Sequence, residues 1–224
     1  MALASLYKQY VKFPSENKVQ EIQRQFMQQS RIPGIVGAID CTHIPIQSPG
    51  GDTVELFRNR NGLFSINVQA ICDHDLILTN VVARWLGSTH DTRNFKNSNI
   101  CARLERREIQ GILIGDNGYP LGPYLITPLL TCTTREQRHF NYALCNARVK
   151  IENVSGIRKR RFPCLRQQLR FKLSTNLLVI TACSVLYNIA RKAAIPVPNE
   201  GDENDNNVPV PVPSNANNMH SVGC

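Results

Sequence analysis

Apolar residues follow two different spacings in the first third of the chain. Val19, Ile22 and Phe26 recur at helical spacing and predict an amphipathic helix over residues 16–27, which a Pro-Gly pair ends. Three short runs rich in β-branched residues come next. They predict strands at residues 35–46, 65–72 and 76–84. The Asp-His-Asp sequence at 73–75 is typical of a hairpin connection with a solvated turn, so antiparallel strands are expected.

The remaining elements up to residue 194 alternate between helix and strand. Helical spacing over residues 92–107 predicts a helix with Asp91 near its N-terminus, and the apolar run 111–114 predicts a short buried strand. A strand after a helix usually runs parallel to an earlier strand. A further short strand is expected at 124–130, with helices at 134–161 and 175–194.

Together these elements predict one α/β domain, a mixed sheet with flanking helices in the order of a ribonuclease H-like fold. We place this domain at residues 34–194, after a helical lead-in at residues 1–33. Residues 195–224 are rich in Pro, Asn and acidic residues without apolar periodicity, and are expected to form a disordered tail.

Composition excludes several classes of protein. The chain has no run of about 18 apolar residues and no signal-peptide core, so neither a membrane span nor secretion is expected, and cytosol or nucleus is the expected compartment. Its eight cysteines are scattered singly without a C-x-x-C pair, which argues against a zinc ribbon and a disulfide framework.

The charge of the chain is unevenly distributed. The net charge is +9, yet residues 200–224 hold four Asp and Glu and no Lys or Arg, so the rest of the chain carries +13. Residues 142–192 contain eleven Lys and Arg but a single acid, Glu152. A surplus of this size suggests a polyanion such as DNA, although a solvated face is the simpler alternative.

Three acids stand at positions where the predicted fold would bring them together. Asp40 ends an apolar strand, Asp116 follows the strand 111–114, and Glu152 lies on the helix 134–161. Asp40 would otherwise be an ordinary strand end, and Asp116, in an Asp-Asn-Gly-Tyr-Pro sequence, a turn residue. Asp91, at the start of the predicted helix 92–107, is by itself typical of a helix N-cap.

The helix around Glu152 places charges and a glycine on one face. Arg148, Glu152, Gly156 and Lys159 share this face, so the acid is flanked by cations and by a residue that permits close approach. Phosphate contacts are expected from five residues. These are Arg148, Arg158, Lys159, Arg160 and Arg161. His43 and His90 are expected to orient neighbouring acids rather than to bind zinc.

Four motifs resemble the Harbinger (PIF-type) transposases and the nucleases derived from them. They are PGIVGAIDCTHI, GSTHDTRNF, GDNGYP and NARVKIENVSGIRKRRF, and they surround Asp40, Asp91, Asp116 and Glu152. Related bacterial insertion-sequence transposases place an Arg four residues before the glutamate and a Lys seven after it. Arg148 and Lys159 match this spacing.

The resemblance implies a DDE transposase catalytic domain, a metal-dependent endonuclease. Asp40, Asp116 and Glu152 would be catalytic and, with Asp91, would hold two Mg²⁺ or Mn²⁺ ions; carboxylates suit such hard cations, which can activate water for phosphodiester cleavage. DNA is the implied substrate, and a Myb/SANT-like protein is the implied partner in DNA binding and nuclear entry. Residence in the nucleus and cytoplasm is expected.

Other interpretations stay open on the sequence alone. Full-length relatives carry more helical sequence before this start, so a truncated N-terminal region is expected. A catalytically idle DNA- or protein-binding module domesticated from a transposase is the main alternative function. A phosphoesterase acting on small substrates is disfavoured, since it would not need so many basic residues.

Overall fold

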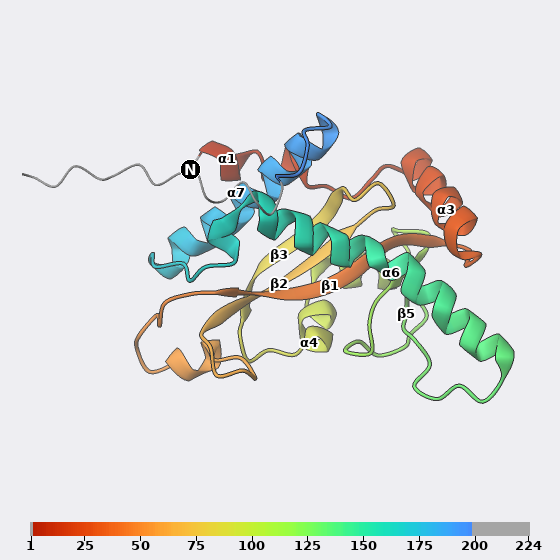
Figure 1. The fold of residues 1–224 in the computed structure, drawn as a ribbon, viewed down its shortest axis with the longest axis horizontal. Helices are drawn as coiled ribbons and strands as arrows, with labels where there is room; N and C mark the ends of the chain where they lie inside the picture. Colours follow the sequence, from red (N-terminus) through yellow and green to blue (C-terminus); the bar gives the residue numbers. More distant parts are fainter. Residues whose placement is uncertain (1, 199–224) are drawn as a thin grey trace, which may run out of the picture.

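The computed structural model describes residues 2–198, and its centre is a five-stranded mixed sheet (Figure 1). The strands lie in the order β3-β2-β1-β4-β5. Their bounds are β1 (Ile35–Pro45), β2 (Ser65–Cys72), β3 (Leu78–Leu86), β4 (Ile112–Ile114) and β5 (Leu125–Ile126). The α-helices are α1 (Ala2–Ser5), α2 (Tyr7–Tyr10), α3 (Glu16–Ser30), α4 (Asp91–Lys96), α5 (Asn99–Glu105), α6 (Arg135–Arg161) and α7 (Leu173–Lys192), and two short 3-10 helices are η1 (Val54–Phe57) and η2 (Pro163–Leu165).

Strand pairing follows the expected pattern. β1, β2 and β3 pair antiparallel, with Ala38 opposite Cys72 and Pro45 opposite Ser65. β4 pairs parallel to β1, with Ile114 opposite Ala38, and β5 pairs parallel to β4. The sequence predictions of an antiparallel start and a parallel fourth strand are therefore confirmed, and the mixed sheet with flanking helices is an α/β ribonuclease H-like architecture.

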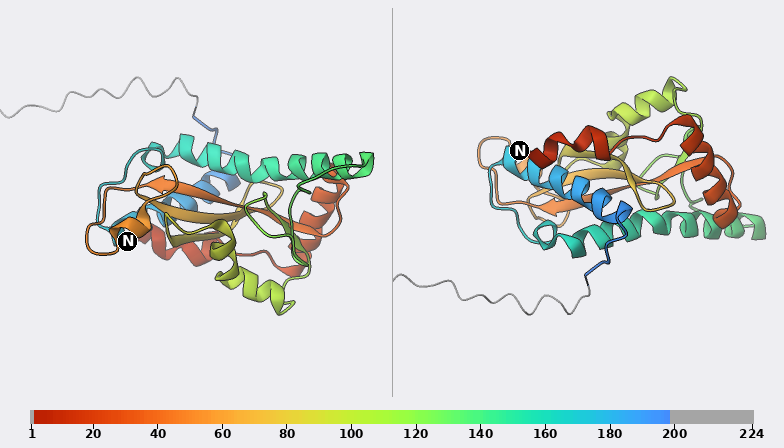
Figure 2. Two further views of the ribbon diagram at one scale, coloured as in Figure 1. Left: turned by 90° about the horizontal axis from the view of Figure 1, so that it is seen from below. Right: turned by 90° about the horizontal axis from the view of Figure 1, so that it is seen from above.

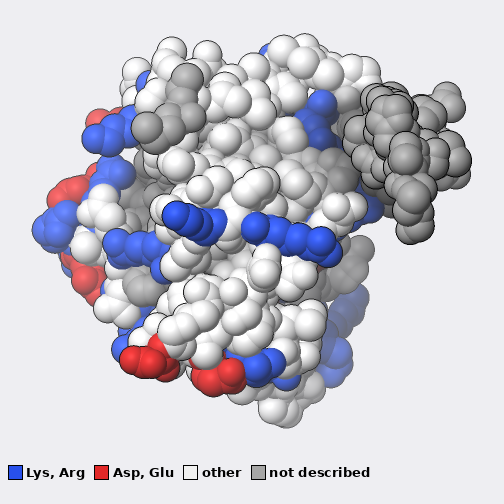
Figure 3. All heavy atoms as spheres, turned by 90° about the vertical axis from the view of Figure 1, so that its left-hand side faces the viewer, with Lys and Arg blue, Asp and Glu red and all other residues white. Residues whose placement is uncertain are grey.

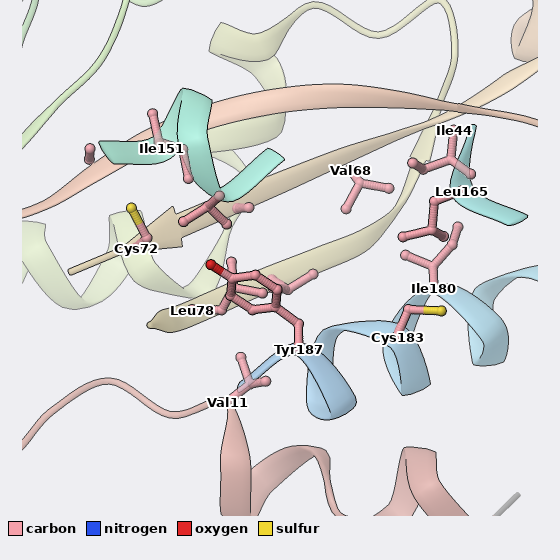
Figure 4. Packing of buried hydrophobic residues seen from close by; sticks show 14 of the residues in the cluster. Val11, Ile44, Val68, Cys72, Leu78, Ile151, Leu165, Ile180, Cys183 and Tyr187 are labelled. Carbon is pink, nitrogen blue, oxygen red and sulfur yellow. The ribbon is translucent and has the colours of Figure 1, made fainter. Parts of the chain in front are cut away.

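The larger hydrophobic core lies between the sheet and helices α6 and α7. Side chains of alternate strand positions, such as Ile44 and Val68, pack against Ile151 of α6 and against Ile180 and Tyr187 of α7 (Figure 4). Alternation arises because successive side chains of a strand point to opposite faces. Figure 2 shows α6 on one side of the sheet and the α4–α5 region on the other.

A second core fills the opposite face of the sheet. Ile39, Ile71 and Leu113 contact a cluster that includes Phe95 of α4 and Leu104 of α5. Helix α3 contributes to both cores, and α1 and α2 pack on α7. The predicted lead-in thus shares the core of the sheet.

Two local predictions were wrong. The helix expected over 92–107 is divided into α4 and α5, because the Ser98 side chain accepts the Cys101 N–H and starts a new helix. In the hairpin turn expected to be solvated, Asp73 is only 5% exposed, and its Oδ1 accepts the Ile77 N–H at 2.9 Å.

Helix α7 is long and apolar enough to cross a membrane by length and composition alone. Core helices also have these properties, and Ile180, Val185 and Tyr187 of α7 are buried against the sheet. The predicted disordered tail lies, from residue 199 onward, outside the described residues.

Candidate functional site

The parallel pairing of β1 and β4 places Asp40 beside Asp116. Ala38 is opposite Ile114, and each aspartate comes two residues after its member of that pair. Asp91, the first residue of α4, completes a set of three carboxylates that line one cleft of about 700 Å³. Three segments far apart in the sequence therefore supply acids to a single cleft.

The turn after β4 fixes how Asp91 and Asp116 face each other. The Gly118 N–H donates to Asp116 Oδ1 at 2.9 Å, and Thr92 Oγ1 donates to the Gly118 carbonyl at 2.7 Å. A Cβ added at Gly118 would lie 3.0 Å from Asp116 Oδ1 and 3.4 Å from Asp91 Oδ2. The glycine therefore leaves open the space between the two carboxylates.

The side chain of Asn67, on β2, orients Asp91. Its Nδ2 donates to Asp91 Oδ1 at 3.0 Å and to the Thr89 carbonyl at 2.9 Å. The N-cap of α4 is His90, and no side chain makes a capping hydrogen bond there. Asp91 is thus held by an amide and directs its other oxygen toward Gly118, and the N-cap interpretation of Asp91 is wrong.

Asp40 is a half-buried carboxylate of this cleft. Burial, helped by the charges of Asp116 and Asp91, raises the pKa of Asp40 to about 6, although the Cys41 N–H and Arg148 lower it. Mutual repulsion among carboxylates that share a cleft is the condition that a bound cation would relieve.

The expected face of α6 adjoins this cleft through its cations. Arg148 acts on the charge of Asp40, and Lys159 donates from Nζ to Thr42 Oγ1 at 2.8 Å, two residues along β1. Burial lowers the pKa of Lys159, and Arg158 adds to this effect while Asp40 opposes it. Both cations therefore lie within electrostatic reach of the aspartates.

Glu152 lies between these two cations on α6 but does not join the cleft. Its side chain is 55% exposed and forms an ion pair with Arg148 at 3.5 Å. Within residues 2–198, no group of three or more His, Cys, Asp or Glu side chains is close enough together to hold a metal ion. The three aspartates have suitable donor chemistry and share a cleft, but they and Glu152 do not converge on one point.

The five residues expected to contact phosphate have different surroundings. Arg158 is 1% exposed, so its predicted role in DNA contact is wrong; position 158 continues the buried stripe of Leu144, Ala147, Ile151 and Val154. Arg161 donates to the Ile195 and Pro196 carbonyls at 2.8 and 2.9 Å. Arg160 is half-buried near the end of α6.

Basic side chains also extend beyond α6. Figure 3 shows Lys and Arg crossing the middle of the face at the left end of Figure 1, with Asp and Glu toward its edges. This is the end at which α6 meets η2 and the β1–β2 connection lies.

The sequence analysis missed Asn67, Arg58 and Arg60 as residues of this site. An asparagine inside a buried strand was the available signal for Asn67, because a buried amide requires partners. Arg58 and Arg60 line the cleft from the β1–β2 connection, which carried no motif. His43 bonds through Nδ1 to Ser65 Oγ at 2.9 Å, and it forms no hydrogen bond to an acid among residues 2–198.

The fold and its cleft define a ribonuclease H-like domain of the DDE type. The model of the DDE superfamily endonuclease family matches residues 39–188, and the chain belongs to this family. It is of the Harbinger transposase-derived kind, and endonucleases of this superfamily generally use divalent metals.

The curated relatives agree with this membership. The chain is 30% identical over 201 residues to "Putative nuclease HARBI1" of Bos taurus, covering 88% of this chain and 57% of that protein. It is 34% identical over 136 residues to "Protein ALP1-like" of Arabidopsis thaliana, covering 53% of this chain and 32% of that protein. The chain therefore spans just over half the length of the nuclease relatives. No solved structure matches it.

Proposed function

We propose that the chain is a divalent-metal-dependent endonuclease that hydrolyses DNA phosphodiester bonds. The observation that carries the proposal is the cleft that Asp40, Asp91 and Asp116 line from three separate segments. Family membership supports a nuclease-type function. The raised pKa of Asp40, to which the charges of Asp116 and Asp91 contribute beside burial, supports a cation as a partner of these acids.

Asp40, Asp91 and Asp116 would hold Mg²⁺ or Mn²⁺, and two ions are the proposed number. Bound cations would supply an activated water and neutralise charge on the leaving oxygen. Asn67 and the Gly118 N–H would keep Asp91 and Asp116 turned toward each other. Glu152 is proposed as the fourth acid, and it would leave its ion pair with Arg148 to reach the cleft.

The cations of α6 would hold the DNA backbone beside the aspartates. Lys159 and Arg148 flank Asp40, where a phosphate must approach for cleavage. Arg160 would extend this contact toward the end of α6. Arg158 is buried and is therefore excluded from this set. Arg161 would contact phosphate only by exchanging its hydrogen bonds to backbone carbonyls for bonds to phosphate.

The cellular setting is proposed on the same basis. A basic domain that cleaves DNA requires access to the nucleus, so we propose residence in nucleus and cytoplasm with a Myb/SANT-like protein as the partner in DNA binding. Imaging of a fluorescent fusion, with and without that partner, would test this setting; a fusion excluded from nuclei in both conditions would contradict it.

Nicking of supercoiled plasmid DNA tests the enzymatic proposal. The parent should nick DNA in Mg²⁺ or Mn²⁺ and not in EDTA, and Asp116→Asn should lose nicking while retaining DNA affinity, because it removes charge but little volume. Asp75→Asn is the matched control, since Asp75 is an exposed acid near Lys18, outside the cleft. Equal nicking by parent and Asp116→Asn would refute the assignment.

A catalytically idle DNA- or protein-binding module is the second candidate function. The observation that favours it is the exposed position of Glu152, paired with Arg148 rather than with the aspartates. Under this alternative the parent binds DNA without nicking it in any divalent metal, and Asp116→Asn behaves as the parent does.

A further inference from the structure

The β1–β2 connection forms one wall of the cleft. This wall carries cations to which the proposed function assigns no role. Arg58, Asn59 and Arg60 line the same cleft as Asp40, Asp91 and Asp116. The connection lies at the left end of the molecule in Figure 1, on the face that Figure 3 shows. The cleft is therefore lined by both acids and arginines.

The two arginines of this wall differ in their partners. Arg58 bonds Glu55 through Nε at 2.7 Å and through a second nitrogen at 3.0 Å, donates to the Gly62 carbonyl and lies over the Phe64 ring. Arg60 is exposed and makes neither a hydrogen bond nor an ion pair within the described chain. Arg60 is thus available to a ligand, whereas Arg58 builds the turn.

Hydrogen bonds among neighbouring residues fix the backbone of the turn that carries Arg60, and none of them involves the Arg60 side chain. Asn59 Oδ1 accepts the Asn61 and Leu63 N–H groups at 3.0 and 3.1 Å, and the Asn59 N–H donates to the Leu63 carbonyl at 2.9 Å. Asn59 Nδ2 also donates to Ser65 Oγ at 3.2 Å, on the first residue of β2. A turn with this many internal bonds loses little further entropy when a ligand binds.

His43 also lines this cleft. Burial lowers its pKa; the charge of Asp91 opposes this, while those of Arg60 and Lys159 add to it. One imidazole therefore lies within electrostatic reach of an aspartate, of the α6 lysine and of Arg60. An anion close to His43 would be attracted by both Lys159 and Arg60, in the cleft that the acids line.

The chain on either side of this wall continues the positive charge. The Gln47 N–H donates to the Leu169 carbonyl at 2.8 Å, which fixes the start of the β1–β2 connection beside the segment 166–172. That segment contributes the exposed residues Arg166, Arg170 and Lys172. These cations therefore lie beside the start of the β1–β2 connection, the same connection that carries Arg60.

We propose that Arg60 binds a backbone phosphate of the nucleic acid that enters the aspartate cleft, on the wall that the β1–β2 connection forms. The ligand chemistry is a phosphodiester flanked by further phosphates. The inference rests on the proposed function for the identity of the nucleic acid as DNA. It extends that function by giving the substrate a second set of contacts outside α6.

Binding of a fluorescent DNA duplex by anisotropy, in EDTA and over a range of salt concentrations, tests this. Arg60→Ala should weaken binding several-fold and reduce the slope of log K against log salt by about 0.9, the contribution of one phosphate. Arg60→Lys should keep most of the slope. Arg135→Ala, an exposed arginine at the other end of α6, should bind as the parent does.

The outcomes separate this inference from the proposed function. Arg60→Ala with parental affinity and slope overturns the inference, even if the parent nicks DNA. A parent that binds DNA without nicking it overturns the nuclease, and the inference holds if Arg60→Ala is still weaker. A parent that binds no duplex, or an Arg60→Ala variant with a lowered thermal midpoint, overturns the inference.

Discussion

Replacing Asp40 by asparagine measures the electrostatic cost of the aspartate cleft. Burial and the neighbouring aspartates raise the pKa of Asp40 from 3.8 to about 6. Each pKa unit corresponds to about 1.4 kcal/mol, so the ionised carboxylate costs the folded, metal-free protein up to about 3 kcal/mol. Solvent at the cleft mouth screens part of this, and we expect Asp40→Asn to raise the free energy of unfolding by about 1–3 kcal/mol at pH 8.

The sign of the pH dependence follows from which state holds the proton more tightly. The folded protein binds the Asp40 proton more tightly than the unfolded chain does, so its stability falls as pH rises through about 4 to 6. Asp40→Asn lacks this decline. The two proteins should therefore differ most above pH 6 and converge near pH 4.

Urea denaturation in EDTA, followed by circular dichroism from pH 4.5 to 8, is the assay. Asp73→Asn is the matched control, because burial, with Asp75 adding to it, also raises the pKa of Asp73 to about 6 at a site away from the cleft. Both variants should gain stability at pH 8. If Asp40→Asn is no more stable than the parent at pH 8, or if its advantage does not shrink toward pH 4.5, the reasoning is refuted.

Three further substitutions follow from individual contacts. Asp91→Asn should leave the metal-free thermal midpoint within about 1 °C of the parent, because no capping hydrogen bond is lost. The same variant should lose nicking activity. Nicking at the parental level would show that Asp91 holds no cation. Gly118→Ala should fold normally and lose most of the Mn²⁺-induced rise in thermal midpoint, because its Cβ would occupy the space between two carboxylates; a full rise would contradict that geometry. Arg158→Met should leave DNA affinity unchanged and raise stability by about 1–2 kcal/mol, because the three guanidinium nitrogens are buried without partners; weakened DNA binding at parental stability would restore its predicted role.

Much of the aspartate arrangement could be predicted from the sequence. The strand after the helix was expected to run parallel to an earlier strand; it pairs with β1, and the positions of Asp40 and Asp116 after apolar runs then bring the two acids together. Asp91 was placed near a helix start, yet its contact with Asn67 could not be predicted, because it depends on the pairing of β2 with β1.

At Arg158 the positive charge suggested an exposed side chain, whereas the helical periodicity indicated a buried one, and the periodicity was correct. The spacing of three and four residues from Leu144 to Val154 continues to position 158, so the helical pattern alone indicated burial there. Asp73 was misjudged for a different reason. The burial of its turn depends on packing across the fold, such as the edge-to-face contact of His74 with Phe26, which local sequence does not reveal.

The arginine wall could not be predicted because its turn carries no catalytic motif. Asn59 and Gly62 do indicate a turn, but only the folded connection places Arg60 beside the acids. Glu152 is the opposite case. The sequence motif around it is clear, but its side chain forms an ion pair with Arg148 outside the cleft.

Calorimetric titration with Mn²⁺ tests directly whether the three aspartates form one cation site. The parent should bind Mn²⁺, and Asp40→Asn and Asp116→Asn should each lose most of the affinity, because each removes one ligand charge from the same cleft. Asp75→Asn should bind as the parent does, and Glu152→Gln should weaken binding if the glutamate joins the cleft. Parental affinity in Asp40→Asn and Asp116→Asn, or a parent that binds no Mn²⁺, would contradict the metal site.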